Sequence, residues 1–226
     1  MKLDLLWRAT GLVTEQQLAE VRYNAWHKDA GYTLEEASYL CDSLRESFDL
    51  PPLSLAALDA AEALHGSRWA FCGGTAINQL VEPRITKDVD VVTSDRSSAI
   101  SALLRSRKFR VEGDKLKHLS GGEIGVLNWE SGNLDCPKAT ALRALAAATT
   151  QRLFGRNVPM VTPAGVIAMK LGRAISNDRK AHQDKSDIIN VLIRYGDQDL
   201  SEYSLTQAMS EEYKRLVEEA KNARRG

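Results

Sequence analysis

Trp69-Ala-Phe-Cys-Gly73-Gly74-Thr75 is followed, after a gap, by Asp88-Val89-Asp90-Val91-Val92, and these two segments are the most informative about the fold. The apolar run before the glycine pair and the β-branched residues around the two aspartates are each typical of a strand. Because side chains alternate between the two faces of a strand, Asp88 and Asp90 project from the same face. Thirteen residues separate Gly74 from Asp88, which leaves room for one helix and a connection. We therefore expect strand, glycine turn, helix and strand, with both carboxylates near the turn.

The glycine pair and the paired carboxylates together suit the binding of phosphate and a divalent cation. Free amides at the start of a helix after Gly73 and Gly74 attract anions, glycine lets a phosphate approach the backbone, and Thr75 adds a hydroxyl. Asp88 and Asp90 would repel each other without a cation or a basic group between them. Mg²⁺ prefers hard oxygen ligands and commonly combines one or two carboxylates with substrate phosphates. The pattern indicates phosphoryl or nucleotidyl transfer with Mg²⁺ as cofactor and a nucleoside triphosphate (NTP) as substrate.

The composition is that of an ordinary globular protein without a strong global charge. Of 226 residues 43% are hydrophobic and 27% charged, and thirty Lys and Arg balance thirty Asp and Glu. An RNA contact would therefore need a local basic patch. The chain has no run of about 18 apolar residues and its start does not resemble a signal peptide, so we expect a cytoplasmic protein without a membrane partner. Cys41, Cys72 and Cys136 are odd in number and widely spaced, which favours reduced thiols.

The order of the expected elements favours an α+β fold, with a small mixed sheet flanked by N-terminal and C-terminal helical regions. We expect a helical region over 1–65, a core over 66–162 and a second helical region over 163–226. Capping boxes at Thr14-x-x-Gln17 and Thr33-x-x-Glu36 mark helix starts in the first region. Strands are expected at 68–72, 88–93, 109–112, 115–119 and 123–129, with a hairpin over 149–154 and 158–161. Helices are expected at 55–64 (preceded by Ser54), 74–80, 96–105, 138–147, 164–175, 183–195 and 201–222.

The glycine pair, thirteen residues and then D-V-D-V resemble the signature of the polymerase-β-type nucleotidyltransferase superfamily. Arg84-x-Thr86-x-Asp88-x-Asp90 is similar to the R-x-T-x-D-x-D pattern of the AbiEii/AbiGii-type nucleotidyltransferases, many of them toxins of toxin–antitoxin or phage-defence systems. A second block over 162–188, with Lys170, Arg173, Arg179, Asp184 and Asp187, is similar to that group's downstream pattern. The two blocks span about 69–192, roughly half the chain, and the resemblance does not extend to the N-terminal 65 residues or the last 30.

The resemblance implies a role for each motif residue. Gly73, Gly74 and Thr75 would hold the triphosphate, Asp88 and Asp90 would bind the metal ions, and Lys170 would reach the phosphates. Asp187 or Asp184 would complete the site as a base or as an orienting group. Two roles are rated about equal for Arg84: contact with the substrate, or pairing with an aspartate that holds the loop. For at least one of Asp184 and Asp187, a surface ion pair with a neighbouring Lys or Arg is the default expectation.

The chain departs from the superfamily pattern at the strand that often carries a third carboxylate. That strand reads Ile124-Gly125-Val126, with glycine at the expected place. Glu123 lies two residues before Gly125, on the same face of the strand, and could take the place of the third carboxylate. Otherwise the base comes from Asp184 or Asp187, or catalysis is weak or absent.

Three functions follow from these observations. The leading one is a Mg²⁺-dependent nucleotidyltransferase that moves a nucleotide from an NTP to RNA or protein as a toxin-type enzyme, with an antitoxin as a partner. The second keeps the chemistry with a small-molecule acceptor, as in antibiotic-inactivating nucleotidyltransferases, and the neutral net charge is compatible with it. The third is a binding module with a degenerate nucleotidyltransferase fold, for which Gly125 is the best support.

Overall fold

The computed structural model describes residues 52–81, 86–113, 115–127, 136–153, 156–176 and 180–224. The capping boxes at Thr14 and Thr33, the N-terminal helices expected from them, Arg84 and Arg179 lie outside the described residues. The boundaries of 1–65, 66–162 and 163–226 therefore stay a prediction.

A mixed seven-stranded sheet forms the centre of the described part of the chain, in the order β3-β4-β5-β2-β1-β7-β6. The pairs β1/β2, β3/β4, β4/β5 and β6/β7 are antiparallel, whereas β2/β5 and β1/β7 are parallel. The expected α+β fold with a small mixed sheet is confirmed, and so is the hairpin. The strands are β1 (Trp69–Cys72), β2 (Asp88–Thr93), β3 (Phe109–Glu112), β4 (Lys115–His118), β5 (Glu123–Val126), β6 (Thr149–Leu153) and β7 (Arg156–Met160).

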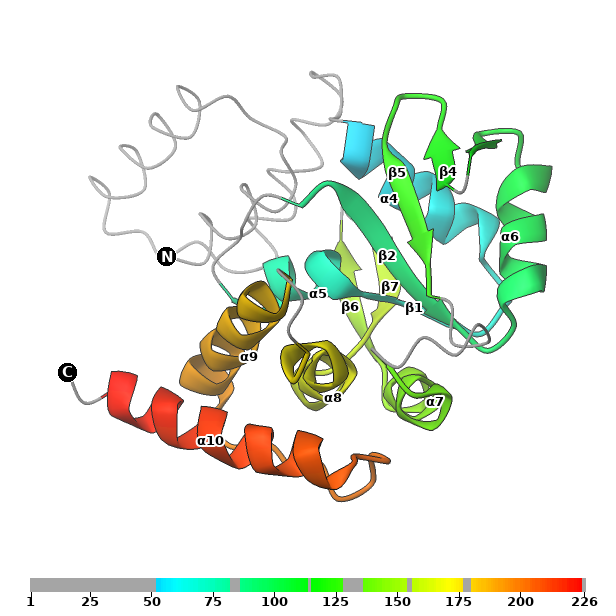
Figure 1. Cartoon of the computed structure of the whole chain (residues 1–226). Helices are drawn as coiled ribbons and strands as arrows, with labels where there is room; N and C mark the ends of the chain where they lie inside the picture. Colours follow the sequence, from blue (N-terminus) through cyan, green and yellow to red (C-terminus); the bar gives the residue numbers. More distant parts are fainter. Residues whose placement is uncertain are drawn as a thin grey trace, which may run out of the picture.

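Helices cover both faces of this sheet (Figure 1). Two of them, α4 and α6, lie on one face, while α5, α7 and α8 lie on the other, with α9 and α10 packed outside α8. The core is built on β1 and β2, because Ala70, Phe71, Val91 and Val92 are fully buried between the two helix layers. The helices are α4 (Pro52–Ala63), α5 (Gly73–Leu80), α6 (Arg96–Arg105), α7 (Lys138–Ala146), α8 (Pro163–Ala174), α9 (Ala181–Tyr195) and α10 (Gln207–Ala223).

Two expected helix starts are wrong. The helix expected at 55–64 begins at Pro52, so Ser54 is a buried residue inside α4 and does not precede it; proline suits a first helical turn. The last helix begins at Gln207 and not at 201, because the Thr206 side chain accepts the main-chain N–H of Met209 and caps it.

Among the described residues, no helix combines the length and apolar character that crossing a membrane requires.

Candidate active site

Asp90 lies at the centre of the candidate site, on β2 between two neighbouring strands. Its partner on β1 is Cys72, and its partner on β5 is Gly125. The main-chain N–H of Gly74, in the first turn of α5, donates a hydrogen bond to the Asp90 carboxylate. Gly73 has a φ of +53°, and a Cβ built there would lie 2.0 Å from Asp90 Oδ2. A glycine at position 73 is therefore required both by the left-handed backbone and by the close approach of the carboxylate.

Asp88 is the second expected metal ligand, at the start of the same strand. It is half-buried, and the Thr86 hydroxyl donates to its main-chain oxygen at 3.0 Å and to its Oδ1 at 3.3 Å. Burial, and then the charge of Asp88, raise the pKa of Asp90 to about 6. The charge of Asp88 therefore disfavours the ionised form of Asp90, as expected from their spacing on one strand face.

The donor set fits a magnesium ion whose remaining ligands come from phosphate and water. Among the described residues, no three His, Cys, Asp or Glu side chains gather into a complete protein-only metal site. Asp88 and Asp90 supply two hard oxygen donors on one strand face, and Mg²⁺ commonly takes one or two carboxylates together with substrate phosphates. A cation between them would also relieve the repulsion that raises the pKa of Asp90.

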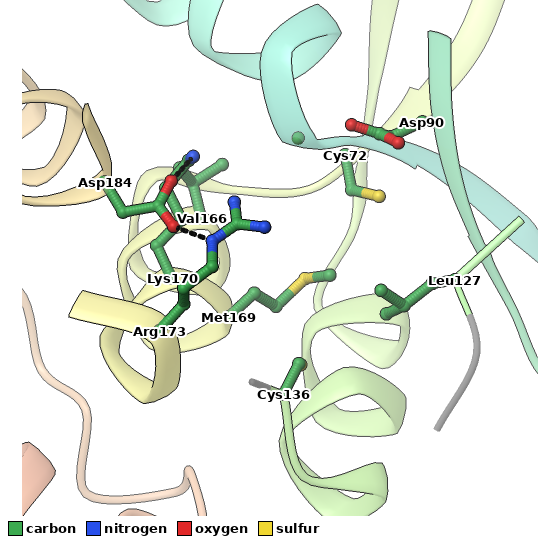
Figure 2. A pocket seen from close by; sticks show the side chains of 10 residues that line it. Cys72, Asp90, Leu127, Cys136, Val166, Met169, Lys170, Arg173 and Asp184 are labelled. Atoms are coloured by element: carbon green, nitrogen blue, oxygen red, sulfur yellow. Dashed lines mark hydrogen bonds and ion pairs between the residues drawn. The ribbon is translucent and has the colours of Figure 1, made fainter. Parts of the chain in front are cut away.

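A pocket of about 150 Å³ opens beside Asp90. Figure 2 shows Asp90 on one side of it and the Lys170, Arg173 and Asp184 side chains on the other. Apolar side chains line the part between them. The lining residues are Cys72, Gly73, Asp90, Leu127, Cys136, Val166, Met169, Lys170, Arg173 and Asp184.

The wall opposite Asp90 is a buried ion cluster between α8 and α9. Lys170 Nζ lies 2.5 Å from Asp184 Oδ1 and 2.9 Å from Asp187 Oδ2. Arg173 Nε donates to the other oxygen of Asp184, and Gln183 Nε2 donates to Asp187 Oδ1 at 3.0 Å. Asp184 and Asp187 are each only 1% exposed. The expectation that at least one of them forms a surface ion pair is therefore wrong, because the packing of α9 on α8 buries both acids against Lys170.

The ion cluster influences Asp90 electrostatically across the pocket. Its two cations and two carboxylates balance one another, so the cluster adds no net charge. Lys170 and, more weakly, Arg173 nonetheless lower the pKa of Asp90, against the larger raising effects of burial and of Asp88. Lys170 is positioned for this by α8, which begins at Pro163 with the Thr162 hydroxyl accepting the Gly165 N–H at 3.2 Å.

The structure brings most of the expected site residues together. Gly73, Asp90, Lys170 and Asp184 line the pocket. Asp88, Gly74, Thr75 and Asp187 lie beside it, in the same elements but outside its lining. Arg84 lies outside the described residues.

Sequence reasoning assigned no role to several residues that line the pocket. Arg173 stands three positions after Lys170 on α8, a spacing that places both side chains on one helix face and could have identified it. Cys72 and Cys136 are both buried, and they are not joined to each other by a disulfide. Burial and then the charge of Asp90 raise the pKa of Cys72, so its thiol stays protonated. The positions of Leu127 and Cys136 depend on long-range packing for which the local sequence holds no signal.

Among the residues that the structure describes, no third carboxylate stands next to Asp90 on the neighbouring strands. Gly125 is its partner on β5, and Glu123 is the partner of Asp88. Both carboxylate oxygens of Glu123 are taken by Lys115 Nζ, at 2.9 and 3.1 Å. Glu123 is therefore neutralised by its neighbour on β4 and is poorly placed to act as the missing acid.

The chain is similar to one family model and, among solved structures, to the two that follow. The family model described as "Nucleotidyl transferase AbiEii toxin, Type IV TA system" matches residues 56–117. A nucleotidyltransferase-like antigenic protein from Paracoccidioides brasiliensis is 21% identical, with 85% of this chain and 92% of that chain covered and a TM-score of 0.48. The antibiotic-resistance factor ANT(2'')-Ia is 14% identical, with 76% of this chain and 90% of that chain covered and a TM-score of 0.39. No curated protein matches the chain.

At these identities and TM-scores the two structural likenesses carry no argument about function. The family match is different, because it covers β1, α5 and β2 and so includes both glycines and both aspartates of the site. The resemblance expected from the sequence is therefore confirmed: the segment that carries Gly73, Gly74, Asp88 and Asp90 matches the nucleotidyl transferase AbiEii toxin family.

Proposed function

We propose that the protein is a Mg²⁺-dependent nucleotidyltransferase that moves a nucleotide from an NTP to an acceptor. The observation that carries this proposal is the position of Asp90. It lies next to Asp88 on one strand face, receives the Gly74 amide at the start of α5, and faces Lys170 and Arg173 across a pocket. Carboxylates for a metal, amides for a phosphate and cations for further phosphate charge thus meet at one place.

Within this proposal Asp88 and Asp90 hold the Mg²⁺. When bound, the ion would neutralise the phosphate charge during an in-line displacement. The start of α5, with Gly73, Gly74 and Thr75, faces the triphosphate. The Gly74 amide already donates to the Asp90 carboxylate, so within the proposal it orients Asp90, and the other donors of this turn, with the Thr75 hydroxyl, face the phosphates.

Lys170 and Arg173 are the cations that face the triphosphate from α8. All four carboxylate oxygens of Asp184 and Asp187 accept hydrogen bonds or ion pairs from Lys170, Arg173 or Gln183. We therefore assign the two acids the role of orienting the cations, in preference to that of a general base, which needs an oxygen free to accept a proton from the nucleophile.

The acceptor is proposed to be RNA or protein, in a toxin-type reaction that an antitoxin restrains. This part rests on the name of the matched family, which is that of a toxin of a toxin–antitoxin system. Arg84, at the start of the R-x-T-x-D-x-D pattern, is proposed to contact the substrate or to hold the loop before β2.

The test is to incubate the protein with each labelled NTP, Mg²⁺ and a total cell extract, and then to measure label in macromolecules. We expect one NTP to be preferred, and the label to be lost with Asp88→Ala, with Asp90→Ala and on addition of EDTA. The matched control is Asp199→Ala, an exposed aspartate on the connection between α9 and α10, which should label as the wild type does.

Sensitivity of the labelled product to ribonuclease or to protease identifies the acceptor as RNA or protein. Label retained by the Asp88→Ala/Asp90→Ala double variant would contradict the mechanism. Label that appears only on low-molecular-weight material would replace the macromolecular acceptor with a small molecule and leave the transfer chemistry in place.

A further inference from the structure

Gly125 occupies the place where a third acid is expected, and its backbone offers no reason for a glycine. It lies within β5 and does not have the positive φ seen at Gly66, Gly73, Gly113, Gly121 and Gly196. Glycine in a strand interior weakens the strand and often marks a close approach by another group. The reason for this glycine must therefore lie in what stands opposite it.

The space beside Gly125 is filled by the Asp90 carboxylate. A Cβ at Gly125 would lie 2.4 Å from Asp90 Oδ1 and 3.6 Å from its Cγ, and apart from chain neighbours it would meet no other described atom within 4 Å. Gly122 is a useful contrast, because its Cβ would meet the main-chain oxygen of Pro52 at 2.5 Å. Gly122 therefore accommodates the packing of α4, whereas Gly125 accommodates the carboxylate of a single side chain.

We propose that Gly125 is a positioning residue for Asp90. Gly73 on one side and Gly125 on the other leave a gap that holds the Asp90 carboxylate, with the Gly74 amide bound to it. The gap fixes the direction in which Asp90 presents its oxygens to the metal. In this arrangement Gly125 is a requirement of the site, and not a degenerate acid position. The inference rests on the proposed function, in which Asp90 is a metal ligand.

The first test measures binding of Mn²⁺ alone, by electron paramagnetic resonance of the free ion. Gly125→Ala should displace the carboxylate and weaken Mn²⁺ binding roughly 10- to 100-fold, as changes behind a metal ligand commonly do. A wild-type affinity in Gly125→Ala would overturn the inference. Far-UV circular dichroism checks that the variant is folded, which we expect because the atom displaced is the end of a flexible side chain.

The second test needs no metal. Urea unfolding is compared for wild type, Gly125→Ala, Asp90→Ala and the double variant, all without divalent cations. In the Asp90→Ala background nothing stands against the new methyl group, so Gly125→Ala should raise the unfolding midpoint there, as a compatible glycine replacement does. In the wild-type background the same change should raise the midpoint less, or lower it. Equal shifts in both backgrounds would show that positions 90 and 125 are independent and would overturn the inference.

Gly125→Asp separates the inference from the idea of a lost third acid. If the position merely lacks an acid, restoring one should strengthen Mn²⁺ binding and labelling. We expect the reverse, because the new side chain begins where the Asp90 carboxylate lies and adds a like charge beside it. If the wild type binds no Mn²⁺ at all, the proposed function is contradicted, while the metal-free unfolding comparison still decides whether Gly125 positions Asp90.

Discussion

Replacing Lys170 by Met removes an ammonium that two buried carboxylates share. Its Nζ lies 2.5 Å from Asp184 and 2.9 Å from Asp187, and the three side chains are 8%, 2% and 2% exposed. Methionine has a similar length and packs against apolar neighbours, so the loss is one of charge more than of volume. Breaking a buried pair by removing one partner costs about 3–5 kcal/mol of stability, because a buried charge is left without compensation.

The contacts that remain place Lys170→Met near the lower end of this range. Asp184 keeps Arg173, and Asp187 keeps its hydrogen bond from Gln183 at 3.0 Å. We therefore expect the free energy of unfolding to fall by about 3 kcal/mol. With an m value of about 2–3 kcal/mol/M, the urea midpoint should fall by roughly 1–1.5 M when unfolding is followed by circular dichroism at pH 7.

The same substitution at an exposed site gives the control. Lys214 is exposed on α10, and Lys214→Met should change stability by less than about 0.5 kcal/mol. Asp187→Asn introduced together with Lys170→Met should recover part of the loss, since it removes one uncompensated charge. A loss below about 1 kcal/mol for Lys170→Met would show that the cluster is hydrated and is not a buried ion network.

Three further outcomes follow from individual contacts. Glu123→Gln should leave NTP-dependent labelling within about twofold of the wild type, because Lys115 already occupies both oxygens of Glu123; a loss of more than tenfold would restore it as a candidate acid. Gly73→Ala should lower the urea midpoint and abolish labelling, since the residue has a φ of +53° and its Cβ would overlap the Asp90 carboxylate at 2.0 Å; an active, stable variant would contradict the described turn. Hydrogen bonding by Arg215 lowers the pKa of Glu212 from 4.5 to about 2, so its stabilising effect is complete above about pH 4.5 and is lost as the pH falls through 2. Glu212→Gln should therefore lower the midpoint at pH 7 and flatten its decline in acid, and an unchanged pH profile would count against the ion pair.

Much of the local structure could be predicted because it depends on neighbours in the sequence. The alternation of valine and aspartate in 88–93 is enough to specify β2 and the common face of its acids. Thr162 and Pro163 specify the start of α8 in the same way, by a side-chain cap and a fixed φ. The expected start of the last helix at 201 is wrong, because the cap that the Thr206 side chain forms with the Met209 amide sets the start of α10 at Gln207.

The features of the candidate site also differ in whether neighbours in the sequence or long-range packing determine them. The glycine turn, the paired aspartates and, through resemblance, the second block around Lys170 could be predicted, because these are patterns of spacing within one or two elements. That Asp184 and Asp187 are buried partners of Lys170, and that Gly125 stands against Asp90, became clear from the folded chain alone. Both facts depend on which elements pack together, α9 on α8 and β5 beside β2, and packing between residues far apart in the chain leaves no periodic signal in the sequence.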